Sequence, residues 1–266
     1  MTTHYGRGLI TKKNVRLDSY FSEDSIFDVE KDKSSDISII SDGKYGKNII
    51  LKKKKRNFDK VVYESFMMDF WNNLLDLYSK ENNLNLNSPI SHDIIYDFDK
   101  RESILAMDFC PGRPIKKIPY LKSDYLDFNG KNVHKSNVIS YYSGVLNKIK
   151  DSEYLLHSDY DDRHILFYNN PVKKINSMSV IDVENSKFSE SREEVNSESK
   201  NLEEILKKHF HNDDDYYFYN KGYESIDSLY SREDIFSKTE KSFNQKFKKN
   251  EKPYVVVDPY NSNVYC

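Results

Sequence analysis

The sequence predicts an α+β protein in two parts, a strand-rich first half with one helix and a helix-rich second half that contains a short β-hairpin. Short β-branched runs separated by polar turns fill the first half, and such runs are typical of strands. Apolar residues at helical spacing dominate the second half. A chain of 266 residues is long enough for one or two domains with a buried core.

The strand-rich half contains a predicted hairpin and a predicted helix. Two glycines in the segment 41–48 indicate a hairpin turn. Phe66, Phe70 and Leu74 recur four residues apart, so the sequence predicts an amphipathic helix over 61–80. The expected strands are 25–32, 36–41, 47–55, 93–99 and 103–109.

The second half begins after Pro111 and Gly112, which interrupt the pattern. Residues 186–201 contain little apolar material, which is typical of a mobile loop or of the start of an exposed helix. The expected helices are 137–156 and 201–210, with one or two more in 213–236, and the expected strands are 164–168 and 178–183.

Composition and charge exclude several classes of protein. Lys and Arg number 41 against 43 Asp and Glu, and a net charge of −2 argues against a general binder of nucleic acid or anionic membranes. Only two cysteines are present, so a disulfide scaffold and a cysteine-rich zinc site are both excluded. Apolar runs are far shorter than the roughly 20 residues of a membrane-spanning helix, and the first residues lack the apolar stretch of a signal peptide. We therefore expect a soluble cytoplasmic protein without a transmembrane segment.

The most informative stretch is a polar loop that runs directly into an apolar strand. His157 and Asp159 lie in this loop, and Asp182 lies at the end of the second strand of the predicted hairpin. Two carboxylates at adjacent strand ends, with an imidazole nearby, can hold a divalent cation and position a nucleophile. Phosphoryl transfer needs this arrangement, because the protein mostly neutralises phosphate charge and orients the attacking hydroxyl.

This pattern resembles the protein-kinase-like phosphotransferases. Their catalytic loop reads H-x-D-x-x-x-x-N before an apolar strand, and here His157-x-Asp159-x-x-x-x-His164 precedes Ile-Leu-Phe. In the small-molecule branch the metal-binding acid follows a hairpin as I-D-x-E/D, and residues 181–184 read I-D-V-E. The closest branch is that of the aminoglycoside and choline phosphotransferases and the lipopolysaccharide (Kdo and heptose) kinases. In some of those sugar kinases a histidine replaces the asparagine.

The resemblance implies a role for each residue of this motif. Asp159 is the catalytic base that accepts the proton of the substrate hydroxyl, and His157 is the catalytic-loop residue that braces the loop. His164 and Asp182 are the ligands of Mg²⁺ or Mn²⁺.

The resemblance also implies a two-lobed protein-kinase-like fold. A small lobe with an antiparallel sheet covers 15–109, and a helical large lobe covers 110–266. The large lobe contains the catalytic loop at 157–166 and the metal-binding strand end at 180–184.

Such enzymes carry a lysine at the end of the third strand, which contacts the α- and β-phosphates of ATP, and a glutamate on the next helix that orients it. Lys52 follows Ile-Ile-Leu at the corresponding position, and Glu64 lies in the first turns of the next helix. Lys54 is the alternative, because it shares one face of the strand with Lys52. A solvated basic run is the non-functional interpretation.

Two further segments match the nucleotide-binding side of these enzymes. The loop 30–36, where glycines usually cover the phosphates, has none, and Ser34 and Ser35 offer amides and hydroxyls instead. Residues 107–115 resemble the segment that joins the two lobes. The backbone groups expected to face the adenine are those of Asp108, Phe109 and Cys110.

The function implied is transfer of the γ-phosphate of ATP to a hydroxyl of a sugar or other small molecule. The I-D-x-E form and the lack of an A-P-E motif favour a small-molecule acceptor. One alternative is a pseudokinase-like module that binds a nucleotide or a protein partner, supported by the glycine-free loop and by His164. Another is a small atypical protein Ser/Thr kinase.

Overall fold

The computed structural model describes two compact units of the chain. Unit 1 comprises the described residues up to Asn72, Pro89–Phe109 and those from Phe236 onward, and unit 2 comprises Asn73–Ser88 and Cys110–Ile235. The predicted α+β class is confirmed. The described residues are 26–31, 36–42, 47–55, 58–97, 102–118, 124–158, 162–208, 214–227, 230–247 and 256–265.

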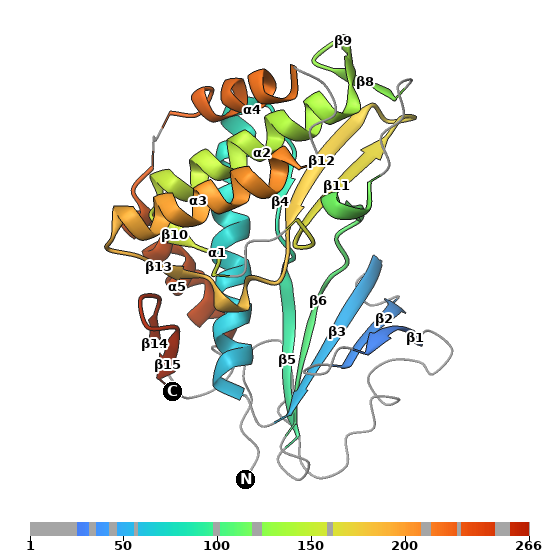
Figure 1. Ribbon diagram of the computed structural model, residues 1–266. Coiled ribbons are helices and arrows are strands. Elements are labelled where there is room, and N and C mark those ends of the chain that lie inside the picture. Colours follow the sequence, from blue (N-terminus) through green and yellow to red (C-terminus); the bar gives the residue numbers. More distant parts are fainter. Residues whose placement is uncertain are drawn as a thin grey trace. The chain divides into compact units, whose positions relative to one another are not determined.

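Unit 1 is built on a five-stranded antiparallel sheet with the order β1-β2-β3-β6-β5 (Figure 1). Each strand falls within two residues of a strand predicted from the sequence. Ile49 and Leu51 of β3 are buried against the core, as is Leu105 of β6. The strands are β1 (Ile26–Lys31), β2 (Asp36–Asp42), β3 (Lys47–Lys55), β5 (Ser91–Asp97) and β6 (Glu102–Asp108).

Helix α1 (Phe58–Asn82) confirms the predicted helix. In unit 1, however, it has no exposed face, because every residue from 61 to 71 is buried. The reason is a second helix, α5 (Arg232–Phe247), whose Phe236 and Phe243 rings pack edge-on against Phe66 at centroid distances of 5.2 and 5.4 Å. A helix covered on all sides has no solvent-facing stripe.

The same aromatic contacts explain why residues from Phe236 onward group with unit 1. The sequence assigned these residues to a lobe covering 110–266, and the lobe bounds 15–109 and 110–266 stay a prediction. A short hairpin of β14 (Val256–Asp258) and β15 (Asn263–Tyr265) follows α5.

Unit 2 is centred on helix α2 (Lys135–Ser152), which packs beside α3 (Arg192–Lys207) and α4 (Asp214–Glu224) (Figure 1). The backbones of α2 and α4 approach closely at two glycines. A Cβ on Gly144 would lie 2.0 Å from the Tyr219 carbonyl oxygen, and a Cβ on Gly222 would lie 2.1 Å from that of Tyr141. Only glycine fits such a contact.

The strands of unit 2 support the loop that follows α2. The antiparallel hairpin of β11 (Ile165–Asn170) and β12 (Ile175–Val180) confirms the predicted pair. It lies in a sheet with the order β4-β12-β11-β7, where β12 and β4 run parallel. The remaining strands of the unit are β4 (Leu86–Asn87), β7 (Arg113–Pro114), β8 (Tyr125–Phe128), β9 (Lys131–His134), β10 (Leu155–Leu156) and β13 (Lys187–Phe188).

Of the two interpretations of the segment 186–201, the start of an exposed helix is confirmed and the mobile loop is wrong. The segment contains β13 and the first ten residues of α3, which begins at Arg192. Val195 and Leu202, two helical turns apart, are 1% and 0% exposed, so one apolar stripe suffices to anchor this polar helix. Within the described part of the chain, no helix combines the length and the hydropathy that crossing a bilayer requires.

Candidate active site

The structure brings Lys52 of β3 and Glu64 of α1 together in unit 1. Lys52 Nζ donates a hydrogen bond to Glu64 Oε1 at 2.9 Å, and both side chains are buried. Lys54 Nζ lies 3.3 Å from the second oxygen, Oε2. Both lysines that the sequence allowed therefore reach the same carboxylate, and Lys52 makes the shorter contact. Their contact with phosphate stays a prediction.

In unit 2, a carboxylate that the sequence analysis did not identify holds the start of the predicted catalytic loop. Glu198 of α3 accepts hydrogen bonds from the backbone amides of His157 at 3.1 Å and Ser158 at 2.6 Å. Its Oε2 also lies 2.9 Å from Nζ of Lys150, a residue of α2 that is fully buried. The position of this loop is thus tied to two helices by one side chain.

His157 links the loop to the segment that contains Asp182. Its side chain is buried, and burial lowers its pKa below the usual 6.5, so the ring is neutral near pH 7. Because a carbonyl oxygen only accepts, Nε2 of this neutral ring is the donor in its 3.1 Å hydrogen bond to Ile181 O. His157 therefore positions other residues, in line with the bracing role that the resemblance implies.

The backbone is left-handed at two positions of this region. Ser158 has φ 63°, and Asp182 has φ 58° and ψ 48°. Glycine adopts this conformation without strain, whereas the serine and the aspartate here carry a Cβ. Strained backbone of this kind is concentrated at functional sites.

His164 and Asp182 lie at adjoining ends of the β11–β12 hairpin. His164 Nε2 is 3.6 Å from Asp182 Oδ2, and a carboxylate oxygen of Asp182 lies within 4.8 Å of one of Glu184. Mg²⁺ bonds are about 2.1 Å long, so two ligands of one ion lie at most about 4.2 Å apart, and the first pair meets this limit. The carboxylate of Asp182 and the imidazole of His164 are therefore close enough to hold one divalent cation.

The residues expected to face adenine are the last residue of strand β6, Asp108, and the two residues that follow it. The Asp108 amide donates to the carbonyl oxygen of Ile90 at 3.0 Å, and the Asp108 carboxylate contacts the imidazole of His92. Phe109 is 39% exposed, whereas Cys110 is nearly buried. The Asp108 amide is thus used inside unit 1, and its predicted contact with adenine would require that hydrogen bond to change.

Three residues of the predicted site lie outside the described residues. They are Ser34, Ser35 and Asp159.

Glu198 and Lys150 were missed because nothing in their local sequence marks them. Glu198 lies in the polar stretch 186–201, where it is one of several acidic residues. The only usable signal would have been the apolar pair Val195 and Leu202, which predicts a helix through this position.

The chain is similar to kinases of known structure. No protein-family model matches the sequence, and no curated protein matches it. The Rio2 kinase in an ADP/Mg²⁺–phosphoaspartate complex, from Chaetomium thermophilum, is 14% identical, with a TM-score of 0.50 over 84% of this chain and 68% of that one. WaaP in complex with acyl carrier protein is 10% identical, with a TM-score of 0.46 over 84% and 89%. The BubR1 kinase domain is 12% identical, with a TM-score of 0.39 over 60% and 46%.

The similarity to Rio2 establishes the protein-kinase-like fold that the sequence predicted. The order of the elements along the chain agrees with this fold. A five-stranded antiparallel sheet with the α1 helix precedes a helical unit that contains the loop, the hairpin and Asp182.

Proposed function

We propose that this protein is an ATP- and divalent-metal-dependent phosphotransferase that transfers the γ-phosphate to a hydroxyl of a sugar or another small molecule. The observation that carries the proposal is the approach of His164 and Asp182 to 3.6 Å at the end of one hairpin. The sequence motif named these two residues as ligands of one ion. The Rio2 kinase, whose fold is similar, was determined with ADP and Mg²⁺.

Each residue of the motif has a role in this proposal. Asp159 accepts the proton of the acceptor hydroxyl, and His157 and Glu198 hold the loop that carries it. Asp182, with His164, holds the metal ion, which when bound neutralises charge on the phosphates. Lys52, oriented by Glu64, pairs with the phosphates.

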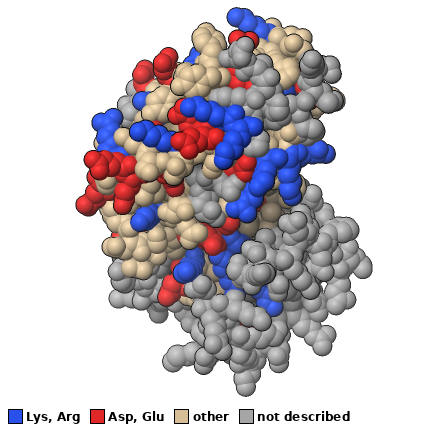
Figure 2. Space-filling view, in the orientation of Figure 1, with Lys and Arg blue, Asp and Glu red and all other residues tan. Residues whose placement is uncertain are grey.

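The charge of the protein supports a small acceptor over a nucleic acid. Basic and acidic side chains lie side by side on the face shown in Figure 2, and the net charge is −2. A nucleic-acid substrate favours a broad basic surface.

The first test is a thermal-shift titration of the full chain with ATP in the presence of Mg²⁺, Mn²⁺ or a chelator. A ligand at about a hundred times its dissociation constant stabilises the folded state by roughly 2.7 kcal/mol, which raises Tm by several degrees. We expect a metal-dependent rise. No shift under any condition would contradict the proposal.

A matched set of lysine variants tests whether Lys52 contacts the bound nucleotide. Lys52→Met should weaken ATP binding by about tenfold or more, the loss expected for one charge-assisted hydrogen bond in a buried site. Lys53→Met is the control, because Lys53 pairs with Glu102 at 2.8 Å and is about one-third exposed. Lys54→Met distinguishes the two lysines that reach Glu64, and equal losses in all three variants would show a general charge effect.

Transfer is tested separately, with γ-labelled ATP and a panel of sugars and amino sugars. Asp159→Asn should abolish labelled product while leaving ATP binding unchanged, and Asp182→Asn should reduce metal-dependent ATP affinity. Full activity of Asp159→Asn would exclude Asp159 as the base. ATP binding without transfer to any acceptor would favour the pseudokinase-like module, for which the glycine-free loop 30–36 and His164 are the supporting observations. Label on the protein itself would favour the protein Ser/Thr kinase.

A further inference from the structure

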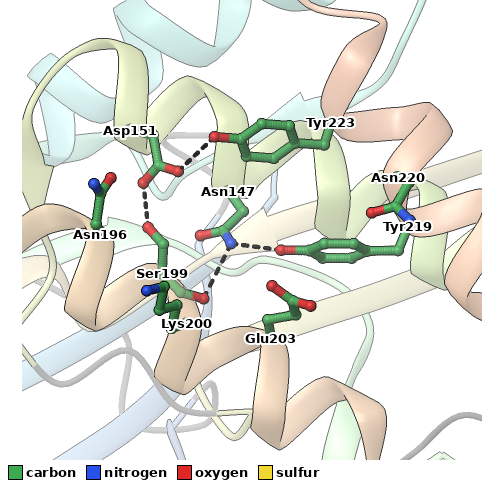
Figure 3. A pocket seen from close by; sticks show the side chains of 9 residues that line it. All are labelled: Asn147, Asp151, Asn196, Ser199, Lys200, Glu203, Tyr219, Asn220 and Tyr223. Carbon is green, nitrogen blue, oxygen red and sulfur yellow. Dashed lines mark hydrogen bonds between the residues drawn. The ribbon is translucent and has the colours of Figure 1, made fainter.

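A polar cavity lies among α2, α3 and α4 of unit 2, on residues that the phosphotransferase proposal does not use (Figure 3). Its volume is about 230 Å³. At roughly 30 Å³ per water molecule in the liquid, this corresponds to a ligand of about eight non-hydrogen atoms. The residues that line it are Asn147, Asp151, Asn196, Ser199, Lys200, Glu203, Tyr219, Asn220 and Tyr223.

Asn147 lines this cavity, and its side chain contains a buried hydrogen-bond acceptor. The residue is 2% exposed, and its Oδ1 has no hydrogen-bond partner among the described residues. Its Nδ2 donates to the carbonyl oxygen of Ser199 at 3.2 Å and to the hydroxyl of Tyr219 at 2.5 Å (Figure 3). The amide cannot be turned over, because the carbonyl of Ser199 would then face another oxygen. The group that completes this site must therefore donate hydrogen bonds.

The charged side chains that line the cavity determine which kind of hydrogen-bond donor fits there. Asp151 accepts hydrogen bonds from the hydroxyls of Ser199 and of Tyr223, the latter at 2.9 Å, which leaves its negative charge in place. The carboxylate of Glu203 points toward Asn147 and Tyr219 in Figure 3. The cavity thus contains two carboxylates against one exposed ammonium, that of Lys200, and this balance disfavours anions.

Glu203 also has a neighbour outside the cavity that must be considered. Lys207 lies 2.8 Å from Glu203 Oε1, one turn further along α3, and its side chain is 46% exposed. An exposed pair at this spacing contributes little, so a ligand cation can compete with it for the carboxylate.

We propose that this cavity binds a small organic cation through an ammonium or guanidinium group that donates hydrogen bonds to Asn147 Oδ1 and to Glu203. None of the residues that line this cavity is a candidate metal ligand or a predicted nucleotide contact.

The test uses butane-1,4-diamine as the probe and the full chain without nucleotide, in equilibrium dialysis at constant ionic strength. Butane-1,4-diol is the matched neutral compound, with the same carbon chain and hydroxyls in place of the ammonium groups. We expect saturable binding of one diamine per chain and no measurable binding of the diol. Equal binding of the two compounds would overturn the proposal.

Variants then assign the binding to this cavity. Glu203→Gln should weaken diamine binding by about tenfold, as expected for loss of one charge-assisted hydrogen bond. Glu204→Gln is the control, because Glu204 is an exposed carboxylate on the same helix outside the cavity. Lys200→Gln should tighten binding by about twofold, since it removes a cation at the rim.

Two outcomes of the variants would reject the site. Equal affinities of Glu203→Gln and Glu204→Gln would remove the carboxylate from the interaction. Loss of binding in Asp182→Asn would place the diamine at the candidate metal ligands instead. This measurement is separate from ATP binding and transfer, so the cavity and the phosphotransferase proposal can fail independently.

Discussion

Replacing Glu198 by glutamine tests how the start of the predicted catalytic loop, at His157 and Ser158, is held. The carboxylate of Glu198 accepts the amides of His157 and Ser158 and lies 2.9 Å from Lys150 Nζ. The Lys150 side chain is fully buried, and that of Glu198 is 16% exposed. Glutamine keeps the shape and one acceptor oxygen, but it removes the negative charge beside a buried ammonium.

The expected loss of unfolding free energy follows from the difference in burial between Lys150 and Glu198. Breaking a buried ion pair by removing one partner costs about 3–5 kcal/mol, because the other charge stays buried. Partial exposure of Glu198 places Glu198→Gln at the low end, about 3 kcal/mol. Lys150→Met should cost less, about 1–2 kcal/mol, because the remaining carboxylate keeps two amide donors and access to water. In the double variant no charge is left buried, so the two losses should not add, and the coupling should be about 2 kcal/mol.

The assay is urea unfolding of the wild type, both single variants and the double variant, with amide exchange of the loop as a local readout. Glu204→Gln, an exposed carboxylate on the same helix, controls for general charge effects. We expect faster exchange at the His157 and Ser158 amides in Glu198→Gln. A loss below about 1 kcal/mol, or strictly additive losses in the double variant, would refute the buried-pair reasoning.

Three further outcomes are expected. Gly144→Ala should destabilise the protein by about 1–3 kcal/mol in thermal unfolding, because the new Cβ would lie 2.0 Å from the Tyr219 carbonyl oxygen, whereas the same change in an open helix is stabilising. Burial raises the pKa of Glu153 from 4.5 to about 7, so the folded state retains a proton that the unfolded chain has lost and stability falls as pH rises between these values. The loss of stability across this pH range should reach about 3 kcal/mol in the wild type, measured as the difference between the urea unfolding free energies at its two ends, and Glu153→Gln should remove it. Parallel pH profiles of variant and wild type would contradict this expectation. Ser158→Gly should change stability by less than about 1 kcal/mol, while Ser158→Val should cost about 1–3 kcal/mol in the same assay, because φ at this position is 63°.

The parts of the fold that local pattern determines were predictable from the sequence. The strand over 47–55 was predicted with both ends correct, because β-branched residues between polar turns leave few alternatives. The β11–β12 hairpin follows from the same kind of signal, but its second strand covers 175–180 instead of the predicted 178–183, so Asp182 follows the strand and does not end it. The contact between Lys52 and Glu64 was expected from their order along the chain and the family resemblance.

Features that depend on distant partners were not predictable. The amphipathic pattern of α1 gave no sign that its second face would be covered by Phe236 and Phe243, which lie far along the chain. The polar buried residues Glu64 and Lys150 are each paired with a charge on another element, and sequence periodicity cannot report such a pairing. Short pairs such as β10 with β13 offer too few residues for a pattern.

Helix α3 shows why the missed region matters for function. Its consecutive residues Glu198 and Ser199 serve different neighbours, since Glu198 accepts the amides of the catalytic loop and Ser199 lines the polar cavity and contacts Asp151. Glu203 lies on the same helix and also lines the cavity. A cation bound there would contact α3 within two turns of the residue that holds the loop. The two candidate sites of unit 2 are therefore joined by one rigid element, and the apolar residues that fix this element, Val195 and Leu202, support both.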